Sequence, residues 1–356
     1  MTNAPFGTFF LPGPTEVRPA VLQAMLQPMI AHRGAAFEAL FARLQHGLRH
    51  VFRTARPVYV SSSSATGLME AAVRGAPPGP VLSVVNGAFA DRFRHIAVAC
   101  AREVDVLAVL PGETVALDAL GARLAARRYA AVTVVHSETS TGALTDVRRV
   151  SDLAHAHGAL CLVDSVTGVG GTPLEFDAWE LDFALTGSQK ALAMPPGLAF
   201  AVASERYLAT VTAAPARGVY FDVAEFERFV HRNQTPNTPA ISLLYAAEAQ
   251  LDAIIADGIE RRWERHRLMA ERTWRWVDDT ARATSLPRRV LAADGARTPT
   301  VTAIELPPHI AAALPKAMAR RGYVIGGGYG AVKETTVRIG HMGDHTVDTL
   351  DGCLAV

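Results

Sequence analysis

The segment CLVDSV at residues 161–166 opens with an apolar run that ends at an aspartate, Asp164. The next segment of this kind, DFALTGSQK at residues 182–190, reaches Lys190 shortly after its own apolar run. Short apolar runs are typical of strands that are buried on both faces of a parallel sheet. The carboxyl ends of such strands meet at the edge where α/β sheets bind ligands. The pattern therefore predicts that Asp164 and Lys190 lie at one binding edge.

Similar apolar runs flank these two segments, and stretches with helical spacing separate several of them. The strand-like runs lie at residues 57–60, 81–85, 104–110, 131–135, 159–163, 183–186 and 198–203. The helical stretches lie at residues 66–74, 89–101, 117–126 and 147–157. Strands that alternate with helices predict an α/β fold with a mostly parallel sheet between helices.

The pattern changes near residue 240. A helical segment at 240–256 runs on through 261–281, and strand-like runs at 300–305 and 335–339 enclose a helix at 311–321. We therefore expect three parts, which are an N-terminal arm at residues 1–15, a large domain at 16–240 and a small C-terminal α+β domain at 241–356.

The composition excludes several classes of protein. The chain has 356 residues, of which 49% are hydrophobic, so a large core can form and a disordered chain is excluded. The 35 basic and 34 acidic side chains nearly cancel, and no basic stretch favours nucleic acid or a membrane surface. Cys100, Cys161 and Cys353 are too few and too dispersed for a disulfide framework. With neither a targeting segment nor a long apolar span, the sequence indicates a soluble cytoplasmic enzyme.

Lysine is rare in this chain, because Lys190, Lys316 and Lys333 are the only lysines among the 35 basic residues. Arginine stays protonated, whereas a desolvated lysine can act as an amine nucleophile. A lysine and an aspartate at one sheet edge suit pyridoxal phosphate, whose aldehyde needs an amine and whose ring nitrogen needs a carboxylate. Taken singly, Asp164 is more typical of a helix cap or a turn, and Lys190 of a solvated loop.

The stretch SSSSATG at residues 61–67 follows one strand-like run and opens the helix predicted at 66–74. Hydroxyl groups and free backbone N–H groups at a helix start can bind a phosphate. Ordinary helix capping is the alternative interpretation, and the stretch lacks the Gly-Lys-Ser/Thr ending of a Walker loop.

Seven motifs follow one another along the chain. They are LPGPT at 11–15, SATG at 64–67, NGAF at 86–89, HSETSTG at 136–142, VDSV at 163–166, GSQK at 187–190 and RIG at 338–340. In this order they resemble the class V aminotransferases, which are fold-type I pyridoxal phosphate enzymes. The alanine/serine–glyoxylate (serine–pyruvate) aminotransferase branch is the most similar, and the resemblance covers almost the whole chain. It implies the fold of the PLP-transferases and pyridoxal 5'-phosphate as the cofactor.

The resemblance also implies roles for individual residues. Lys190 would form the Schiff base, and Asp164 would contact the pyridine nitrogen. Val166 and Phe89 would pack on the two faces of the ring, although a core position in its helix is an alternative for Phe89. Thr139 would reach the ring hydroxyl, unless it only belongs to a polar turn.

Further matches concern the phosphate and the substrate. The residues implied at the phosphate are Ser64, Ala65, Thr66 and Gln189, with Asn237 and Thr238 from the neighbouring subunit. The last two imply a homodimer with sites at the interface, while the prolines around them are also typical of a plain loop. Arg338 would hold the substrate carboxylate through two parallel hydrogen bonds. Gly13 would lie near the same substrate, and the glycine-rich run 326–330 would form a loop over it.

The predicted activity is transfer of an amino group from alanine or serine to glyoxylate or pyruvate, through two half-reactions at one site. Three alternatives stay open. A phosphoserine or 2-aminoethylphosphonate aminotransferase would use His32 and Arg33 as an anion-binding pair, but the later substrate loop lacks the second pair. A cysteine desulfurase would need a cysteine between residues 320 and 340, where there is none. A non-catalytic PLP-fold protein would have no need of Lys190. No metal site is expected from the histidines.

Overall fold

A seven-stranded sheet forms the larger part of the computed structural model, which describes residues 6–212, 214, 216–284 and 286–356. The strand order is β2-β10-β9-β8-β5-β3-β4. These strands are β2 (Tyr59–Ser61), β3 (Val81–Val85), β4 (Val104–Ala108), β5 (Ala131–Val135), β8 (Leu160–Asp164), β9 (Phe183–Gly187) and β10 (Ala199–Ala203). Only β10 runs antiparallel to its neighbours, so the predicted mostly parallel sheet is confirmed.

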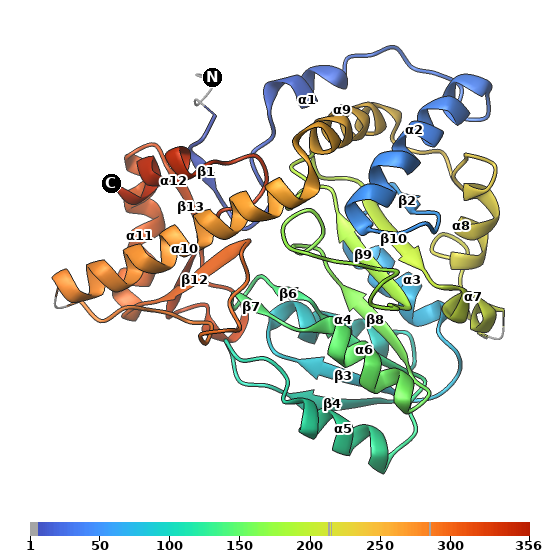
Figure 1. Cartoon of the computed structure of the whole chain (residues 1–356), viewed down its shortest axis with the longest axis horizontal. Helices are drawn as coiled ribbons and strands as arrows, with labels where there is room; N and C mark the ends of the chain where they lie inside the picture. The colour runs from blue at the N-terminus through green and yellow to red at the C-terminus, as the bar shows by residue number, and fades with distance from the viewer. Residues whose placement is uncertain (1–5, 213, 215, 285) are drawn as a thin grey trace.

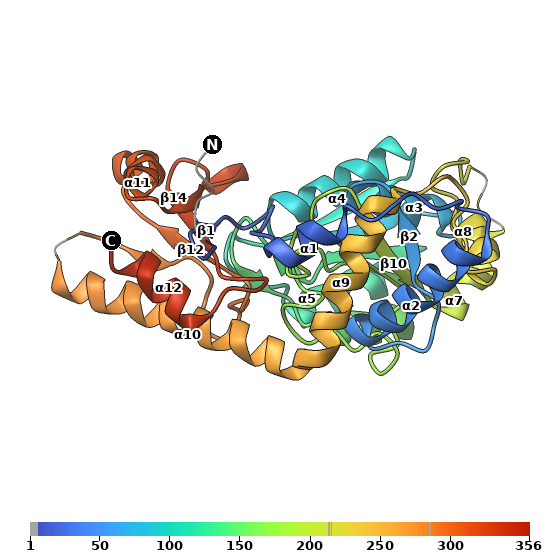
Figure 2. The same ribbon diagram turned by 90° about the horizontal axis from the view of Figure 1, so that it is seen from above.

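Helices cover both faces of this sheet, with α3 and α4 on one side and α5 and α6 on the other (Figures 1 and 2). The helices of this part are α1 (Pro19–Ala24), α2 (Ala35–Phe52), α3 (Ala65–Gly75), α4 (Ala88–Ala99), α5 (Leu117–Ala126), α6 (Val147–Ala156), α7 (Glu205–Val211), α8 (Val223–Val230) and α9 (Ile241–Asp257). Because helices exclude water from both faces, every residue of the central strands β5, β8 and β9 is buried. The α/β fold predicted from the sequence is thereby confirmed.

A second, five-stranded sheet has the order β1-β13-β14-β12-β11. Its strands are β1 (Phe9–Phe10), β11 (Arg289–Val290), β12 (Val301–Glu305), β13 (Val324–Gly327) and β14 (Thr336–Gly340), and its helices are α10 (Ile259–Ala283), α11 (Pro308–Arg320) and α12 (Val347–Leu354). The arm predicted at residues 1–15 therefore contributes a strand to this sheet, while residues 1–5 lie outside the described part. The boundaries predicted near residues 15 and 240 stay predictions.

The helix predicted to run on from residue 240 to 281 is interrupted. Gly258 has a φ of +86°, a conformation that glycine adopts readily, and it ends α9 and starts α10. Helix α9 packs on α1 and α2, whereas α10 extends to the second sheet (Figure 1). Because of this break, α9 packs with the helices of the larger part and α10 packs against the second sheet.

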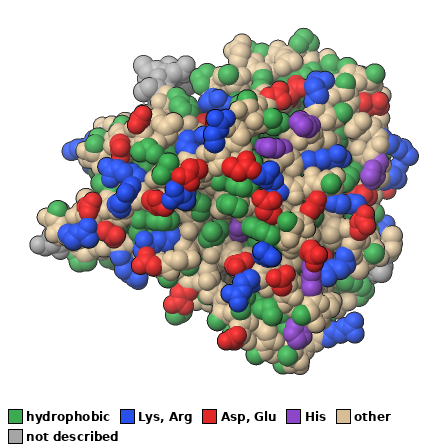
Figure 3. Space-filling view, viewed as in Figure 1, with side chains coloured by type: hydrophobic (Ala, Val, Ile, Leu, Met, Phe, Trp, Pro, Cys, Tyr) green, Lys and Arg blue, Asp and Glu red, His purple; other side chains and the backbone are tan. Residues whose placement is uncertain are grey.

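The surface shown in Figure 3 carries basic and acidic side chains close to one another, as the near-zero net charge leads one to expect. Among the described residues, no helix combines the length and apolar character that a membrane crossing requires.

Candidate active site

The sheet brings Asp164 and Lys190 to one edge, as the two apolar runs predict. Asp164 is the last residue of β8 and lies beside Leu185 of β9. Strand β9 ends at Gly187, and the following turn carries Lys190. The exposed fractions are 2% for Asp164 and 8% for Lys190, so both charged groups are held away from water. Burial of two ionisable side chains at a strand end marks this edge as a candidate active site.

The N-terminal segment around Gly13 encloses the lysine. The Nζ of Lys190 donates a hydrogen bond of 2.6 Å to the carbonyl of Pro12, and the hydroxyl of Thr15 donates one of 3.0 Å to the carbonyl of Lys190. Gly13 has a φ of +111°, and a Cβ placed on it would lie 2.4 Å from Nζ of Lys190. Only glycine therefore allows this segment to approach the lysine so closely. The motif LPGPT at 11–15 thus lies against the lysine side chain.

Burial shifts the pKa of the lysine. Desolvation is the largest cause that lowers the pKa of Lys190 to about 8, and the guanidinium groups of Arg338 and Arg92 lower it further. The carboxylates of Asp164 and Glu138 act in the opposite direction. An amine with such a pKa is partly neutral near pH 8, and the neutral amine is the form that attacks a carbonyl or accepts a proton.

The carboxyl group of Asp164 is shifted in the opposite sense. Desolvation raises its pKa to about 7, and the nearby carboxylate of Glu138 raises it further. The backbone N–H of Val166 donates a hydrogen bond of 2.8 Å to Oδ1 of Asp164 and favours the charged form. A buried carboxylate of this kind would be stabilised by a cation placed beside it, such as a protonated ring nitrogen.

The candidate phosphate region lies at the start of α3. Ser64 precedes this helix, is exposed and makes no capping bond with its side chain, while Ala65 is buried. The Oε1 atom of Gln189 is buried and lacks a hydrogen-bond partner among the described residues. A Cβ on Gly187 would lie 2.8 Å from that oxygen and 3.5 Å from Cβ of Ala65. The backbone N–H groups and the Thr66 hydroxyl at this helix start can donate to a phosphate, and Gln189 would contact one through its amide NH₂ group, because Oε1 only accepts.

Aromatic and cationic side chains surround the ring of Phe89. The ring of Tyr329 stacks on it at 5.5 Å between centroids, with 17° between the planes. The guanidinium of Arg92 lies 4.7 Å from the Phe89 centroid, and Nζ of Lys190 lies 5.8 Å from it. The sequence predicts a ring-stacking role for Phe89, and the structure places its ring beside the lysine.

Arg338 and Thr139 approach the same place from different elements. Arg338 lies on β14 of the second sheet, where its Nε donates a hydrogen bond of 2.9 Å to the carbonyl of Gly327. Its Nη1 lies 3.4 Å from the carbonyl of Thr139, to which it donates. The hydroxyl of Thr139 is 3.3 Å from that of Thr167. A guanidinium within electrostatic range of Lys190 is suitably placed for a substrate carboxylate.

The loop with Asn237 and Thr238 does not join this group of side chains in the single chain. Both residues are exposed. Arg33 donates hydrogen bonds of 2.8 and 3.0 Å to the carbonyls of Thr235 and Pro236, and Nε2 of His32 lies 3.4 Å from the hydroxyl of Thr238. The His32–Arg33 pair thus holds the loop from the same chain.

Three residues of this cluster are not predicted from the sequence, namely Glu138, Arg92 and Tyr329. Glu138 is part of the quoted motif HSETSTG at 136–142, and its signal is a carboxylate among small polar residues. Arg92 lies three residues beyond Phe89, at a helical spacing that places both side chains close together. Tyr329 comes from the glycine-rich run 326–330, and no local pattern indicates that it meets Phe89.

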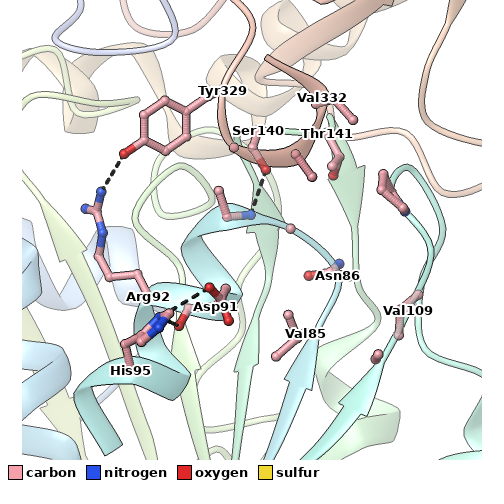
Figure 4. Close-up of a pocket in the computed structure, with 16 residues that line it drawn as sticks. Val85, Asn86, Asp91, Arg92, His95, Val109, Ser140, Thr141, Tyr329 and Val332 are labelled. Atoms are coloured by element: carbon pink, nitrogen blue, oxygen red, sulfur yellow. Dashed lines mark hydrogen bonds and ion pairs between the residues drawn. The ribbon is translucent and has the colours of Figure 1, made fainter. Parts of the chain in front are cut away.

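A cavity of about 620 Å³ lies beside this cluster. Its walls come from the ends of β3 and β4, the first turns of α4 and the short helix η1 (Gly330–Val332). Figure 4 shows Tyr329 above Arg92, with Ser140 and Thr141 at one side of the cavity. Tyr329 accepts a hydrogen bond of 3.1 Å from Arg92 and so links the second sheet to α4.

Residues 79–340 match the family described as "Aminotransferase class-V". The chain belongs to this family. The L-aspartate–glyoxylate aminotransferase of Paracoccus denitrificans is 32% identical, over 95% of this chain and 86% of that protein. The serine–glyoxylate aminotransferase of Arabidopsis thaliana is 30% identical, over 97% and 88%. An alanine–glyoxylate aminotransferase structure from a Nostoc species superimposes with a TM-score of 0.89 at 31% identity, covering 98% of this chain and 94% of that one.

These matches confirm the family resemblance that the seven motifs indicate. The protein is a class V aminotransferase, an enzyme that depends on pyridoxal phosphate and has glyoxylate-type transaminases among its relatives. Its substrates are therefore an amino acid and an oxo acid.

Proposed function

We propose that this class V aminotransferase transfers the amino group of L-alanine or L-serine to glyoxylate or pyruvate by a ping-pong mechanism. The observation that carries the proposal is the buried Lys190–Asp164 pair with Arg338 in electrostatic range of the lysine. The relatives support it, because two of the three act on serine or alanine together with glyoxylate, according to their names.

The described side chains suit the cofactor. When bound, pyridoxal phosphate supplies an aldehyde that captures the amino group and a ring that withdraws electrons. Asp164 would hold a proton on the ring nitrogen, and Phe89 and Val166 would pack on the two faces of the ring. Thr139 would contact the ring hydroxyl. We place the phosphate at the start of α3, against Ser64, Ala65, Thr66 and Gln189.

The chain's own residues would then orient the substrate and move one proton. The guanidinium of Arg338 would bind the substrate carboxylate, and the backbone of Gly13 would limit how the substrate can tilt. The Nζ of Lys190, with its lowered pKa, would take the proton from the substrate Cα atom and deliver it to the cofactor carbon that carried the aldehyde. Phe89 and Tyr329 would keep water from this proton transfer.

We further propose that the enzyme works as a homodimer with sites at the interface. Asn237 and Thr238 are exposed, and Arg33 braces their loop from within the same chain. An exposed polar loop that is fixed by hydrogen bonds is suited to contact the phosphate of the cofactor bound by a second copy of the chain.

A panel of amino donors tests the proposed substrates. L-alanine, L-serine, L-aspartate, L-phosphoserine and 2-aminoethylphosphonate are each combined with glyoxylate, pyruvate and 2-oxoglutarate. We expect the highest kcat/KM for alanine or serine with glyoxylate or pyruvate, and parallel double-reciprocal plots. A preference for a phosphorus-containing donor, or intersecting plots, would contradict the proposal.

A pair of lysine variants controls this experiment. Lys190→Ala should abolish turnover, because no other amine replaces the one at the sheet edge. Lys316→Ala changes an exposed lysine on α11 and should leave turnover unchanged. Equal activity in both variants would refute the role of Lys190.

A further inference from the structure

Glu138 is a fully buried carboxylate beside the candidate active site, with an exposed fraction of 0%. One of its oxygens, Oε2, accepts hydrogen bonds from the backbone N–H groups of Phe89 at 3.1 Å and Ala90 at 3.0 Å. The other, Oε1, accepts from the backbone N–H and the hydroxyl of Ser140 at 2.9 and 2.6 Å. Each oxygen of this side chain thus accepts two hydrogen bonds, and two of the four donors belong to the first turn of α4.

On its outer side, the first turn of α4 borders the cavity of about 620 Å³, which Gly87 and Ala88 help to line. On its inner side, a Cβ placed on Gly87 would lie 2.4 Å from Cγ of Glu138, so glycine permits the close approach. The backbone N–H of Ala88 donates a hydrogen bond of 3.0 Å to the hydroxyl of Ser140. Hydrogen bonds to Glu138 and Ser140 therefore help to fix the position of this turn.

We propose that Glu138 is a positioning residue, which holds the first turn of α4 so that the Phe89 ring lies against the face of the cofactor. The inference rests on the proposed function, in which Phe89 stacks on the cofactor ring. It assigns a task to a carboxylate that forms no ion pair with a neighbouring side chain in the described part of the chain. A negative charge near helix N–H groups is also favoured by the helix dipole.

The charge of Glu138 has a second effect at the same place. It raises the pKa of Lys190 and that of Asp164, and it opposes the effects of the guanidinium groups of Arg338 and Arg92. The neutral variant Glu138→Gln should therefore lower the pKa of the lysine amine, while the polar shape of the side chain is kept.

Cofactor binding to the apoprotein gives a readout that does not depend on turnover. In Glu138→Gln, the amide NH₂ group cannot accept a hydrogen bond, so the variant loses either the two bonds from the N–H groups of Phe89 and Ala90 or the bond from the N–H of Ser140. We expect the dissociation constant of pyridoxal phosphate to rise by about tenfold or more. Glu103→Gln, which changes an exposed carboxylate that immediately precedes β4 and pairs with Arg127, is the matched control and should leave the constant unchanged.

A double-mutant cycle with Phe89→Ala separates positioning of the ring from general stability. If Glu138 acts through the ring, Glu138→Gln should weaken cofactor binding much less in the Phe89→Ala background than in the parent. Additive effects of the two substitutions, or an unchanged dissociation constant in Glu138→Gln alone, would overturn the proposal. If Glu138→Gln does not fold, Glu138→Asp replaces it in the cycle, because aspartate keeps the charge but withdraws it from α4. The same outcomes for the dissociation constant of pyridoxal phosphate then support or overturn the proposal.

The cycle also distinguishes this inference from the proposed function. A parent protein that binds pyridoxal phosphate but fails on every donor in the panel would refute the substrates, while the cycle still reports on Glu138. The pH midpoint of the visible absorption of the loaded protein gives a further check, because it should fall in Glu138→Gln and stay unchanged in Glu103→Gln.

Discussion

Replacing Asp164 by asparagine should stabilise the apoprotein at neutral and alkaline pH. The carboxyl group is buried, and its pKa in the folded chain is about 7 compared with 3.8 for the free side chain. The folded state therefore holds this proton more tightly than the unfolded state between these two pH values. Asparagine stays neutral at every pH, and its side-chain oxygen can still accept the N–H of Val166.

The size of the effect follows from the pKa difference. One pKa unit corresponds to 1.36 kcal/mol, so about three units give roughly 4 kcal/mol. Below the pKa of the unfolded state the acid is protonated in both states, and the two proteins should be equally stable. As the pH rises to 7, the wild type loses stability because the unfolded state gives up the proton first. The advantage of Asp164→Asn should be about 1.7 kcal/mol at pH 5 and roughly 4 kcal/mol at pH 8.

Urea denaturation of the two apoproteins, at one protomer concentration and at several pH values, measures this difference. Groups that titrate equally in both proteins cancel in the comparison. A variant that is no more stable than the wild type at pH 8, or an advantage that does not grow between pH 4 and pH 8, would refute desolvation of the carboxylate. The loaded variant should also lose most of its activity, since the ring nitrogen would have no carboxylate beside it.

Three further predictions concern residues around the lysine. The rate at which pyridoxal phosphate associates with the apoprotein, measured by stopped-flow absorbance, should rise with pH and level off above about 8. Arg338→Gln should move the midpoint of this pH profile upward, because it removes a cation that lowers the pKa of Lys190. Gly13→Ala should destabilise the protein by roughly 1–3 kcal/mol and weaken cofactor binding, because the added Cβ would lie 2.4 Å from Nζ of Lys190. Thermal denaturation and titration with the cofactor measure these two effects. Arg262→Met breaks a buried ion pair of 2.7 Å with Asp344 and should cost about 3 kcal/mol in urea denaturation, whereas unchanged stability would contradict this role.

The large sheet and its binding edge could be predicted because the relevant signals are local. Buried parallel strands are short apolar runs, and the rule that their carboxyl ends meet brings Asp164 and Lys190 together without any knowledge of side-chain positions. The helix that the stretch SSSSATG opens begins at Ala65, within one residue of the prediction. Family resemblance then supplied the cofactor and the roles of individual residues, which neither spacing nor composition contains.

Other features could not be predicted, because they depend on contacts between segments that are distant in the sequence. Glu138 and Phe89 are separated by almost fifty residues, and only the folded sheet places the carboxylate against the first turn of α4. Tyr329 reaches Phe89 from the second sheet in the same way. The break at Gly258 is different, since a single glycine can either be tolerated within a helix or end it, and the local pattern does not distinguish the two.

The two central ionisable groups owe their properties mainly to exclusion of water. Desolvation is the largest cause of the shift for both Lys190 and Asp164, and it moves their pKa values towards each other, to about 8 and about 7. The lowered pKa makes the neutral, proton-accepting form of Lys190 available near pH 8, and the raised pKa of Asp164 favours a cation beside its carboxylate. A substitution that lets water reach Lys190 and Asp164 would return their pKa values towards those of the free side chains. Substitutions at Phe89 and Gly13, which carry no charge but lie close to Nζ of Lys190, should therefore also change the pKa of this amine.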